Sequence, residues 1–530
     1  MTNSNALQLM QENIHHVVYV MFENRGFDHM LGFLYGPDDR INYIPKSPFK
    51  PFQGLPSPLP QLPASASFYD NPAAYTGPWK RIEKASGQYC CTPSKDPGEA
   101  FDPVTRQIFG TMHNTDLPRQ YQMQGFWLNW QQHRGDAGAD EILQCNTKHE
   151  VPVLHHLAKA FAVSDDYFCS VPSQTNPNRA FSLAGTSLGR INNLSACGKT
   201  LETKTTIFNA FEEWNKTHPN SATWKIYYPH DWVCSLREQA YTRYMYKPLQ
   251  QFSEDGLHFA GIGEEGDPTG GTFLADAAAG TLPSLSYLEP VFIGERLLTD
   301  VSSYHPPTSL LEGEKFLHKI YKAVRNSPKW KNTLLIVNFD EHGGTYDHVP
   351  PPRGAARPDD SPSTFGFDRF GVRVPFLLIS PYIENSTVIR PDPAGCAQEL
   401  PFDHTSILAT LCKWKGIPYN NPAGNDNYDL GRRTFAAPTF EHVFTNSFDA
   451  SKPKAESIPL PSCSDERCHY LSSSTALAFA SAAISRKTGQ VAGSDQHTAV
   501  LAELKAACRT AAEVTTFIDN LPETESEPQG

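Results

Sequence analysis

Three stretches of this sequence are almost continuously apolar, and each ends abruptly at polar residues. They are HHVVYVMF at 15–22, TLLIVNF at 333–339 and VPFLLIS at 374–380. Short runs of this kind, rich in β-branched residues, predict strands with both faces buried, because an exposed face would carry polar residues at alternate positions. Such strands belong mainly to parallel sheets that helices cover on both sides. The three runs therefore restrict the chain to an α/β fold.

Further strand and helix patterns lie between these runs. Strands are predicted at 161–168, 223–228 and 285–288, and helices at 24–34, 151–160, 179–187 and 312–326. Strands that alternate with helices are typical of a sheet whose strands are mostly parallel. We therefore expect a central, mostly parallel sheet with helices on both faces.

Proline is the unusual part of the composition, with 44 residues against 35 glycines in a chain of 530. Seven prolines fall within 45–63, which predicts a surface loop inserted into the fold, because proline disrupts helices and central strands. After residue 450 the chain becomes Ala-rich at 472–483 and 498–512 and ends in a polar, acidic tail. We expect a catalytic domain over 1–450, and over 451–530 a helical region with a disordered tail.

The net charge of −12 argues against a nucleic-acid-binding protein, which normally carries a basic face. The first residues lack the basic and apolar segments of a signal peptide, and no apolar run reaches the length of a membrane span. We therefore expect a protein that is cytoplasmic or exported by a leaderless route.

Eleven cysteines are too few for a disulfide scaffold, and their odd number mildly favours a reducing compartment. We expect most of them to be buried and reduced. Cys90 with Cys91, and Cys463 with Cys468, are candidate bridges that spacing alone cannot establish.

Polar residues follow the buried strands at the places where an α/β protein binds its ligands. Glu23 and Asn24 follow the first apolar run, and Asp340 and Glu341 follow the second. In open α/β sheets, ligands bind outside the carboxyl ends of the strands. Carboxylate and amide oxygens that converge there are suited to a hard divalent cation, with Ca²⁺, Mg²⁺ and Mn²⁺ favoured. We therefore predict a metal site at this edge.

These residues also have plainer interpretations. Glu23 and Asn24 could cap a helix, and the two acids at 340–341 could be surface charge. The segment DEHGGTYDH at 340–348 superficially suggests a zinc protease, but Gly343 and Gly344 disfavour the necessary helix and the HExxH order is absent.

Thr175 lies in a turn-rich loop between Pro172 and Pro177, just before the predicted helix at 179–187. It could be an ordinary loop residue. A helix N-terminus nevertheless offers backbone N–H groups and a positive potential to an anion. A threonine hydroxyl is a poor nucleophile at neutral pH, so a catalytic role needs a metal ion or a base beside it. Together with the acids, it suggests phosphoryl transfer.

Five segments in order along the chain resemble one known family. They are VYVMFENRGFDHMLGFL (18–34), FAVSDDYFCSVPSQTNPNRAFSLAGTS (161–187), SYHPPTSLLEGEKFLHKIYKAVRNSPKWKNTLLIVNFDEHGGTYDHVPPP (303–352), FGVRVPFLLISPYI (370–383) and DHTSILATL (403–411). They resemble the phosphoesterase family that contains bacterial and plant non-specific phospholipases C and a bacterial acid phosphatase. The resemblance implies an alkaline-phosphatase-like fold.

The resemblance also implies roles for particular residues. Glu23, Asn24, Asp340 and Glu341 would hold a divalent metal ion, with Thr175 beside it. Thr175 would be the nucleophile and form a phosphothreonine intermediate, and Asn24 would contact a phosphoryl oxygen.

Three histidines receive roles in the same way. His305 would steady the phosphate or protonate the leaving group. His342 and His404 are further catalytic candidates, and structural support is an equally weighted alternative for both.

Two positions depart from the family pattern. The segment DPGEAF (96–101) carries Glu99 where the family has a histidine, and a carboxylate donates a hydrogen bond to phosphate only when it is protonated. Glu99 therefore has a different catalytic role, or His113 or His133 replaces the missing histidine, or activity is weakened. Gly26 stands where a serine is usual.

A phospholipase C that releases diacylglycerol and a phosphorylated head group from glycerophospholipids agrees best with these motifs. An acid phosphatase with the same site is the first alternative, and a non-catalytic phosphate- or lipid-binding protein is the second. Transient contact with a membrane surface is expected of a phospholipase. The region after residue 450 could cover the site, bind lipid, mediate oligomerisation or pack on the scaffold.

Overall fold

The structure is a computed structural model. It describes residues 3–112, 115–135, 139–193, 204–229, 240–252, 256–264, 270–292, 301–358, 365–393, 399–419, 425–444, 448–463, 484, 487–488, 494–507, 517 and 520–521.

A nine-stranded sheet runs through the centre of the protein in the order β2-β13-β7-β12-β11-β1-β10-β8-β9. Its strands are β1 His16–Phe22, β2 Asn42–Ile44, β7 Ala162–Val163, β8 Trp224–Tyr228, β9 Phe259–Gly261, β10 Leu285–Leu288, β11 Thr333–Phe339, β12 Phe376–Ile379 and β13 Thr387–Ile389. Only β12 runs against its neighbours among these strands. The prediction of a mostly parallel sheet is confirmed.

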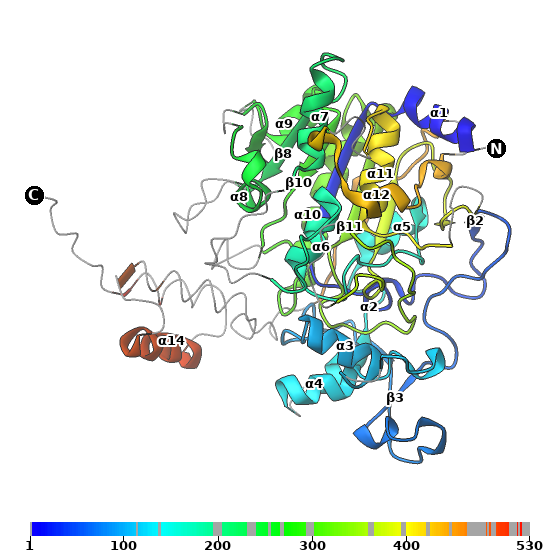
Figure 1. Ribbon diagram of the computed structural model, residues 1–530, viewed down its shortest axis with the longest axis vertical. Coiled ribbons are helices and arrows are strands. Elements are labelled where there is room, and N and C mark those ends of the chain that lie inside the picture. Colours follow the sequence, from blue (N-terminus) through cyan, green and yellow to red (C-terminus); the bar gives the residue numbers. More distant parts are fainter. Residues whose placement is uncertain are drawn as a thin grey trace, which may run out of the picture.

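Helices cover both faces of the central strands, because every residue of β11 is buried and six of the seven in β1 are buried. The helices are α1 Asn3–Asn13, α2 Phe27–Leu31, α3 Phe101–Phe109, α4 Phe126–Arg134, α5 Pro152–Ala160, α6 Thr175–Ala184, α7 Ile207–Asn215, α8 Tyr241–Met245, α9 Phe273–Ala279, α10 Leu310–Asn326, α11 His404–Lys415, α12 Gly431–Ala436 and α14 Asp495–Ala507. One group joins α6, α11, α12 and α1, and a second joins α5, α10 and α9 (Figure 1).

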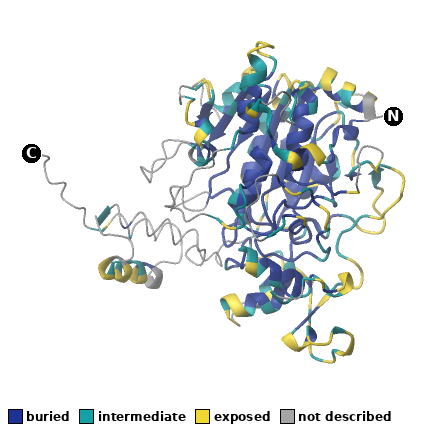
Figure 2. Ribbon diagram, in the orientation of Figure 1, coloured by how far each residue is buried: buried dark blue, intermediate teal, exposed yellow. Residues whose placement is uncertain are grey.

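A smaller unit lies beside the carboxyl ends of the central strands. It contains α3, α4 and the hairpin of β3 Gln61–Pro63 with β4 Trp79–Arg81, seen at the bottom of Figure 1. Its own hydrophobic core includes Trp130, Phe126 and Ile108. The pair β5 Glu83–Lys84 and β6 Gln144–Cys145 joins its two ends. Figure 2 shows buried residues in the central strands and exposed residues around the hairpin.

Three predicted elements have different bounds. The helix expected over 24–34 is reduced to α2, because Asn24 has a left-handed φ of 57° that a helix cannot contain. The helix expected from residue 179 already begins at Thr175, since Pro177 falls in its first turn, where no intrahelical N–H is needed. The strand expected over 161–168 is shortened to β7, beyond which the chain makes only isolated bridges.

The proline-rich insertion is mainly irregular, as predicted, but its end is not. Residues 61–63 form β3 on the edge of a two-stranded sheet, a position where Pro63 is tolerated because an edge strand need not donate every N–H.

The start of the C-terminal region packs against the main body of the protein. Ala455 and Ile458 belong to the main hydrophobic core, and His318 of α10 bonds through Nε2 to the Ala455 carbonyl at 2.8 Å. Helix α14 overlaps the helix predicted at 498–512. The helix predicted at 472–483 and the acidic tail lie outside the described residues.

The cysteine prediction was wrong in its pairing. Cys90 is bonded to Cys463 across 373 residues, and Cys91 is also disulfide-bonded. The sequence neighbours are not joined, because the fold returns the segment before Cys463 to the loop that carries Cys90. Among the described residues, Cys145, Cys169 and Cys412 are buried free thiols.

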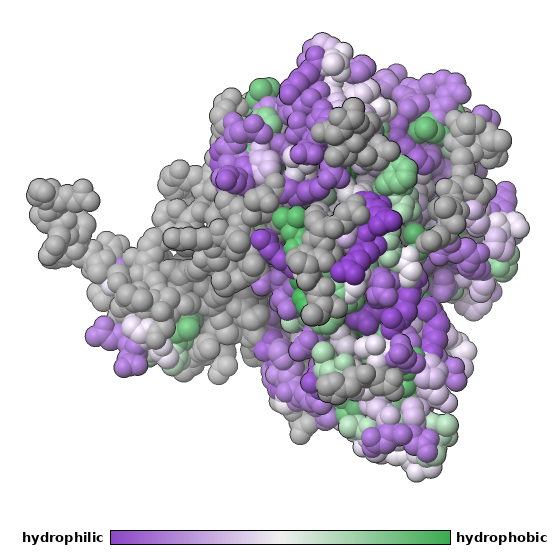
Figure 3. Space-filling model, viewed as in Figure 1, coloured by the Kyte–Doolittle hydropathy of each residue, from purple (hydrophilic) through white to green (hydrophobic). Residues whose placement is uncertain are grey.

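No helix among the described residues is long and apolar enough to cross a membrane. On the face shown in Figure 3, hydrophilic residues predominate and hydrophobic ones are scattered.

Candidate active site

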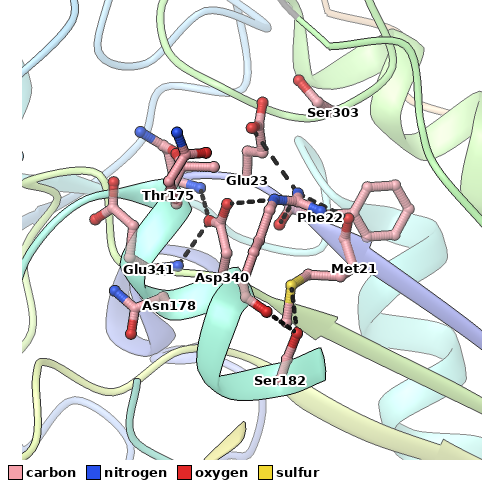
Figure 4. A network of polar contacts seen from close by, with 12 residues as sticks. Met21, Phe22, Glu23, Thr175, Asn178, Ser182, Ser303, Asp340 and Glu341 are labelled. Carbon is pink, nitrogen blue, oxygen red and sulfur yellow. Dashed lines mark hydrogen bonds and ion pairs between the residues drawn. The ribbon is translucent and has the colours of Figure 1, made fainter. Parts of the chain in front are cut away.

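The register of the two central strands brings their polar ends together. Phe22 of β1 lies beside Phe339 of β11, so the residues that follow them, Glu23 and Asp340, are neighbours. The Asp340 N–H donates to the Phe22 carbonyl at 3.1 Å, and Asp340 is fully buried. Figure 4 shows Glu23, Asp340 and Glu341 gathered with Thr175 at this edge. The prediction that the strand ends converge is confirmed by this arrangement.

Asn24 is turned into the site by its left-handed backbone. Its N–H donates to Asp340 Oδ1 at 3.1 Å. Gly343 packs against it so closely that a Cβ atom there would lie 2.2 Å from the Asn24 carbonyl oxygen. The glycine after the acidic pair therefore permits the approach of two strand-end loops.

Thr175 is the first residue of α6, and its side chain faces the strand ends. Its hydroxyl donates to Asn24 Oδ1 at 3.4 Å, and only 7% of the residue is exposed. Because the first N–H groups of a helix have no intrahelical acceptor, the start of α6 favours an anion beside this hydroxyl.

Arg179, which the sequence interpretation missed, lies one helical turn after Thr175. Its Nε donates to Asp340 Oδ2 at 3.1 Å, and its Nη2 lies 3.8 Å from Glu23 Oε1. Burial lowers the pKa of Arg179, but Asp340 and the other anions outweigh it and raise the pKa above its ordinary value. The i, i+4 spacing from Thr175 was the available signal, since such residues share one helix face.

Glu341 is fully buried and only partly satisfied. Its Oε2 accepts from the Gly343 N–H at 2.6 Å, whereas Oε1 has no hydrogen-bond partner among the described residues. Burial, together with the charges of Glu99 and Asp340, raises the pKa of Glu341 well above its ordinary value.

Glu99 orients the Asn24 amide. The Asn24 Nδ2 group donates to Glu99 Oε2, which leaves Asn24 Oδ1 to accept from Thr175. Gln174 donates to the other carboxyl oxygen of Glu99 at 3.1 Å. Burial, with the charge of Asp96, raises the pKa of Glu99 well above its ordinary value. Glu99 therefore lies beside Asn24 and positions its amide.

His305 faces Glu99. Its Nδ1 donates to the Pro306 carbonyl at 2.5 Å, so Nε2 carries the lone pair, and Nε2 lies 3.6 Å from Glu99 Oε2. Burial lowers the pKa of His305 to about 3. The imidazole is therefore neutral, and its Nε2 presents a lone pair toward Glu99.

The other two predicted histidines are held by the scaffold. His404 bonds through Nε2 to the Asp340 carbonyl at 2.6 Å and through Nδ1 to the Tyr167 hydroxyl at 2.9 Å. His342 bonds through Nε2 to Gln107 Oε1 at 2.8 Å, and its Nδ1 lies 3.4 Å from Glu341 Oε2. Burial lowers the pKa of His404 to about 4 and that of His342 to about 3. Their geometry is that of supporting residues, the alternative weighed from the sequence.

Neither proposed replacement for the family histidine is observed in the site. His133 is exposed on α4, whereas Glu99 is buried, and His113 lies outside the described residues.

Five buried carboxyl groups form what we call the acidic cluster: Glu23, Asp96, Glu99, Asp340 and Glu341. Three guanidinium groups oppose them among the described residues. Arg179 contacts Asp340, and Arg134 lies 3.8 Å from Asp96. The third group is that of Arg25. Burial lowers the pKa of Arg25 to about 9, and the negative charge of Asp96 opposes this shift. The carboxyl groups outnumber the guanidinium groups, and burial with neighbouring acids raises the pKa of Glu99 and Glu341, so a bound cation would stabilise the ionised cluster.

Two groups of side chains at this site could hold such an ion. Glu23, Asn24, Thr175, Asp340 and Glu341 supply oxygen atoms, and among the described residues Glu341 Oε1 has no donor to satisfy it. Asp96, Glu99 and His305 form a second group whose ligand atoms lie within 4.8 Å of one another. Asn24 connects the two groups.

Comparisons with known proteins show which family the chain resembles. Residues 14–418 match the phosphoesterase family. The chain is 31% identical to non-specific phospholipase C1 of Arabidopsis thaliana over 83% of this chain and 73% of that protein. It is 24% identical to the non-hemolytic phospholipase C of Burkholderia pseudomallei (strain K96243) over 85% of this chain and 61% of that protein. A solved alkaline phosphatase superfamily protein from Vibrio parahaemolyticus aligns with a TM-score of 0.30 and 13% identity, over 55% of this chain and 64% of that one.

Proposed function

We propose that this chain, which belongs to the phosphoesterase family, is a metal-dependent phospholipase C that uses Thr175 as its nucleophile. The observation that carries the proposal is the position of the Thr175 hydroxyl at the start of α6, 3.4 Å from Asn24 Oδ1 and beside the acidic cluster. The names of the plant and bacterial relatives support phospholipids as substrates.

We infer that Glu23, Asn24, Asp340 and Glu341 hold the divalent ion, because Glu341 presents a buried oxygen that no described donor satisfies. When bound, the ion lowers the pKa of a nearby hydroxyl and stabilises negative charge on phosphoryl oxygens. Asp340 accepts three hydrogen bonds, which leaves lone-pair capacity on its carboxylate.

The protein residues arrange the attack of Thr175 on phosphorus. Asn24 accepts the Thr175 proton in a hydrogen bond and thereby fixes the direction of the hydroxyl, while Glu99 fixes the Asn24 amide. A carboxylate of the acidic cluster takes the Thr175 proton as the new bond forms between Thr175 Oγ1 and phosphorus. The bond from phosphorus to the alcohol leaving group breaks, and water then releases the phosphoryl group from Thr175. His305 and Glu99 hold one proton between them, which can pass to the departing oxygen.

The acidic cluster favours a phosphodiester over a phosphomonoester. A diester carries one negative charge near neutral pH, whereas a monoester carries nearly two. The carboxyl groups of Glu99 and Asp96 belong to the same site as the nucleophile, and they disfavour the more highly charged monoester. Cationic side chains in their place would favour it. The phospholipase C proposal is therefore preferred to acid phosphatase, and the nucleophile geometry favours both over a protein that only binds lipid.

Of the two localisations expected from the sequence, we favour export. The bonds at Cys90 and Cys91 support it, because disulfides persist mainly in oxidising compartments. Transient contact with a membrane surface belongs to the same proposal.

A test compares the wild type with Thr175→Ala and Thr175→Ser on p-nitrophenyl phosphorylcholine and p-nitrophenyl phosphate, with Mg²⁺, Ca²⁺ or Mn²⁺ supplied. We expect the diester to be hydrolysed with the higher kcat/KM. Thr175→Ala loses on the order of 10³-fold or more in kcat, and Thr175→Ser keeps part of the activity because it retains a hydroxyl. Wild-type turnover by Thr175→Ala would contradict the nucleophile assignment, and a higher kcat/KM on the monoester would favour acid phosphatase.

A further inference from the structure

A cavity of ≈ 1020 Å³ lies apart from the acidic cluster. Its walls come from α5, from the turn at 147–149, from segments 33–39 and 84–87, and from segment 453–462 of the C-terminal region. Among the described residues, no member of the acidic cluster lines it, and neither does Thr175. Its size is that of a binding site for a small organic molecule.

The charge of the cavity wall is opposite to that of the whole chain. Lys84, Lys148 and Lys159 line the cavity, whereas the chain carries a net charge of −12. Among the described residues, Asp39 is the only carboxylate in the lining, and it already accepts from Lys159 Nζ at 3.0 Å. Two lysines therefore remain for an anionic ligand.

A nearby acid, Glu150, is not part of the cavity lining. Glu150 is fully buried, and its Oε2 accepts both from the Thr147 N–H and from the Thr147 hydroxyl at 2.8 Å. His149 and His156 instead line the cavity beside the lysines. His156 Nδ1 donates to the Pro152 carbonyl at 2.6 Å, so the groups on this wall that bind phosphate are the lysine ammonium groups.

The remaining wall is apolar. Phe33 and Leu34 contribute from the segment after α2, and Pro453 and Ile458 contribute from the C-terminal region. Lys84 Nζ lies 5.1 Å from the centre of the Phe33 ring, so a cationic group and an apolar surface meet at one place. This combination matches a molecule with a charged end and an apolar body.

The C-terminal wall is fixed to the scaffold. The Tyr321 hydroxyl of α10 donates to the Pro453 carbonyl, and Arg325 Nη2 donates to the Lys452 carbonyl at 3.0 Å. The bond between Cys463 and Cys90 closes the end of this segment. The start of the C-terminal region therefore completes a formed cavity.

We propose that this cavity is a second binding site, separate from the catalytic one, for a phosphate group carried on an apolar body. The ligand is an amphiphilic phosphoester, either embedded in a bilayer or free in solution. Lys84 and Lys148 contact its phosphate, and the apolar wall around Phe33 and Ile458 holds its tail.

The test uses the full chain with Lys84→Glu and Lys148→Glu combined. The matched control combines Lys46→Glu with Lys331→Glu, which makes the same change of charge at two exposed lysines outside the cavity. Binding of monododecyl phosphate below its micelle concentration is measured by calorimetry in a chelator. Inorganic phosphate is the probe without a tail.

We expect the cavity variant to lose about tenfold or more in affinity for monododecyl phosphate and the control to match the wild type. Inorganic phosphate binds more weakly than the amphiphile.

Vesicles of phosphatidylcholine, with and without phosphatidic acid, distinguish the source of the ligand. If the ligand is a membrane lipid, sedimentation with anionic vesicles is lost in the cavity variant alone. If it is a soluble amphiphile, sedimentation is the same in all three proteins while the calorimetric difference persists. Equal affinity in all three proteins, equal weakening in the control, or no binding by the wild type would overturn the proposal. Asp340→Asn should still bind monododecyl phosphate, so a failure of the catalytic proposal leaves this one intact.

Discussion

Two groups of buried carboxylates take residues from the same two chain segments, 23–28 and 340–348, yet their charges are neutralised differently. In the acidic cluster, Glu341 Oε1 has no described hydrogen-bond partner, and burial with neighbouring acids raises the pKa of Glu99 and Glu341. The second group, which we call the arginine-paired cluster, contains Asp28, Asp347, His348 and Arg373.

In the arginine-paired cluster the protein supplies its own cation. Arg373 Nη2 lies 3.0 Å from both Asp28 Oδ1 and Asp347 Oδ2, and His348 Nδ1 lies 2.5 Å from Asp28 Oδ2. Burial would raise the pKa of Asp28, but His348 and Arg373 outweigh it and lower the pKa below its ordinary value. Burial raises the pKa of Asp347 to about 6, which still leaves it ionised at neutral pH. Clustered acids therefore indicate a metal site only where the protein leaves their charge uncompensated.

The largest expected effect separates the two clusters by metal content. Asp340→Asn removes a proposed ligand charge, so we expect loss of bound divalent metal and a fall of about 10³-fold or more in kcat/KM. Asp347→Asn is the matched control, a buried aspartate that also bonds to an arginine, and it should keep the metal. Elemental analysis of purified protein gives the metal content. Full metal content in Asp340→Asn, or equal loss in both variants, would contradict the distinction.

Much of the fold was predictable because the sequences of the long strands are continuously apolar, which indicates that both faces of each strand are buried. β1 and β11 are continuous apolar runs, and the parallel register between them turns two separate sequence positions, Glu23 and Asp340, into neighbours. Strands of three residues such as β9 and β13 were not predicted. Their burial comes from the surrounding structure, and three residues carry no periodicity.

The contacts that give the site its chemistry were less accessible. Glu99 could be recognised as a departure, but its bond to the Asn24 amide depends on how two distant loops meet. Arg373 lies 26 residues after Asp347, and nothing in that spacing shows that it neutralises one acidic group and not the other. The bond from Cys90 to Cys463 was hidden for the same reason.

The next effect is on stability in the absence of metal. Arg373→Met leaves Asp28 and Asp347 without their cation, and we expect the free energy of unfolding to fall by about 3–5 kcal/mol. Glu341→Gln removes a charge from the acidic cluster, so in a chelator it should leave stability unchanged or increase it. Urea unfolding measures both. If Arg373→Met does not fold, Arg373→Lys, which keeps the charge but not the bidentate geometry, should show a smaller loss. Equal destabilisation by Arg373→Met and Glu341→Gln would remove the contrast.

The smallest effect is a difference in how stability depends on pH, and it tests the charge balance directly. Burial, with the charge of Asp96, raises the pKa of Glu99, so the folded protein binds this proton more tightly than the unfolded chain does. The stability that Glu99 contributes is fully present below about pH 4.3, the ordinary pKa of glutamate, and is lost as the pH rises toward the folded value.

For Asp28 the pKa is lowered, so its contribution is present above about pH 3.9 and is lost as the pH falls. In a chelator we therefore expect the wild type to lose stability as the pH rises above about 4.3, by about 1.4 kcal/mol for each unit by which the pKa is raised. Glu99→Gln should flatten this part of the curve. Asp28 is itself ionised in both states over this range, but it raises the pKa of His348, so Asp28→Asn should change the slope through that histidine. A slope in Glu99→Gln identical to that of the wild type would mean that the folded protein does not hold the Glu99 proton more tightly than the unfolded chain, and the case for a bound cation would then lose its electrostatic basis.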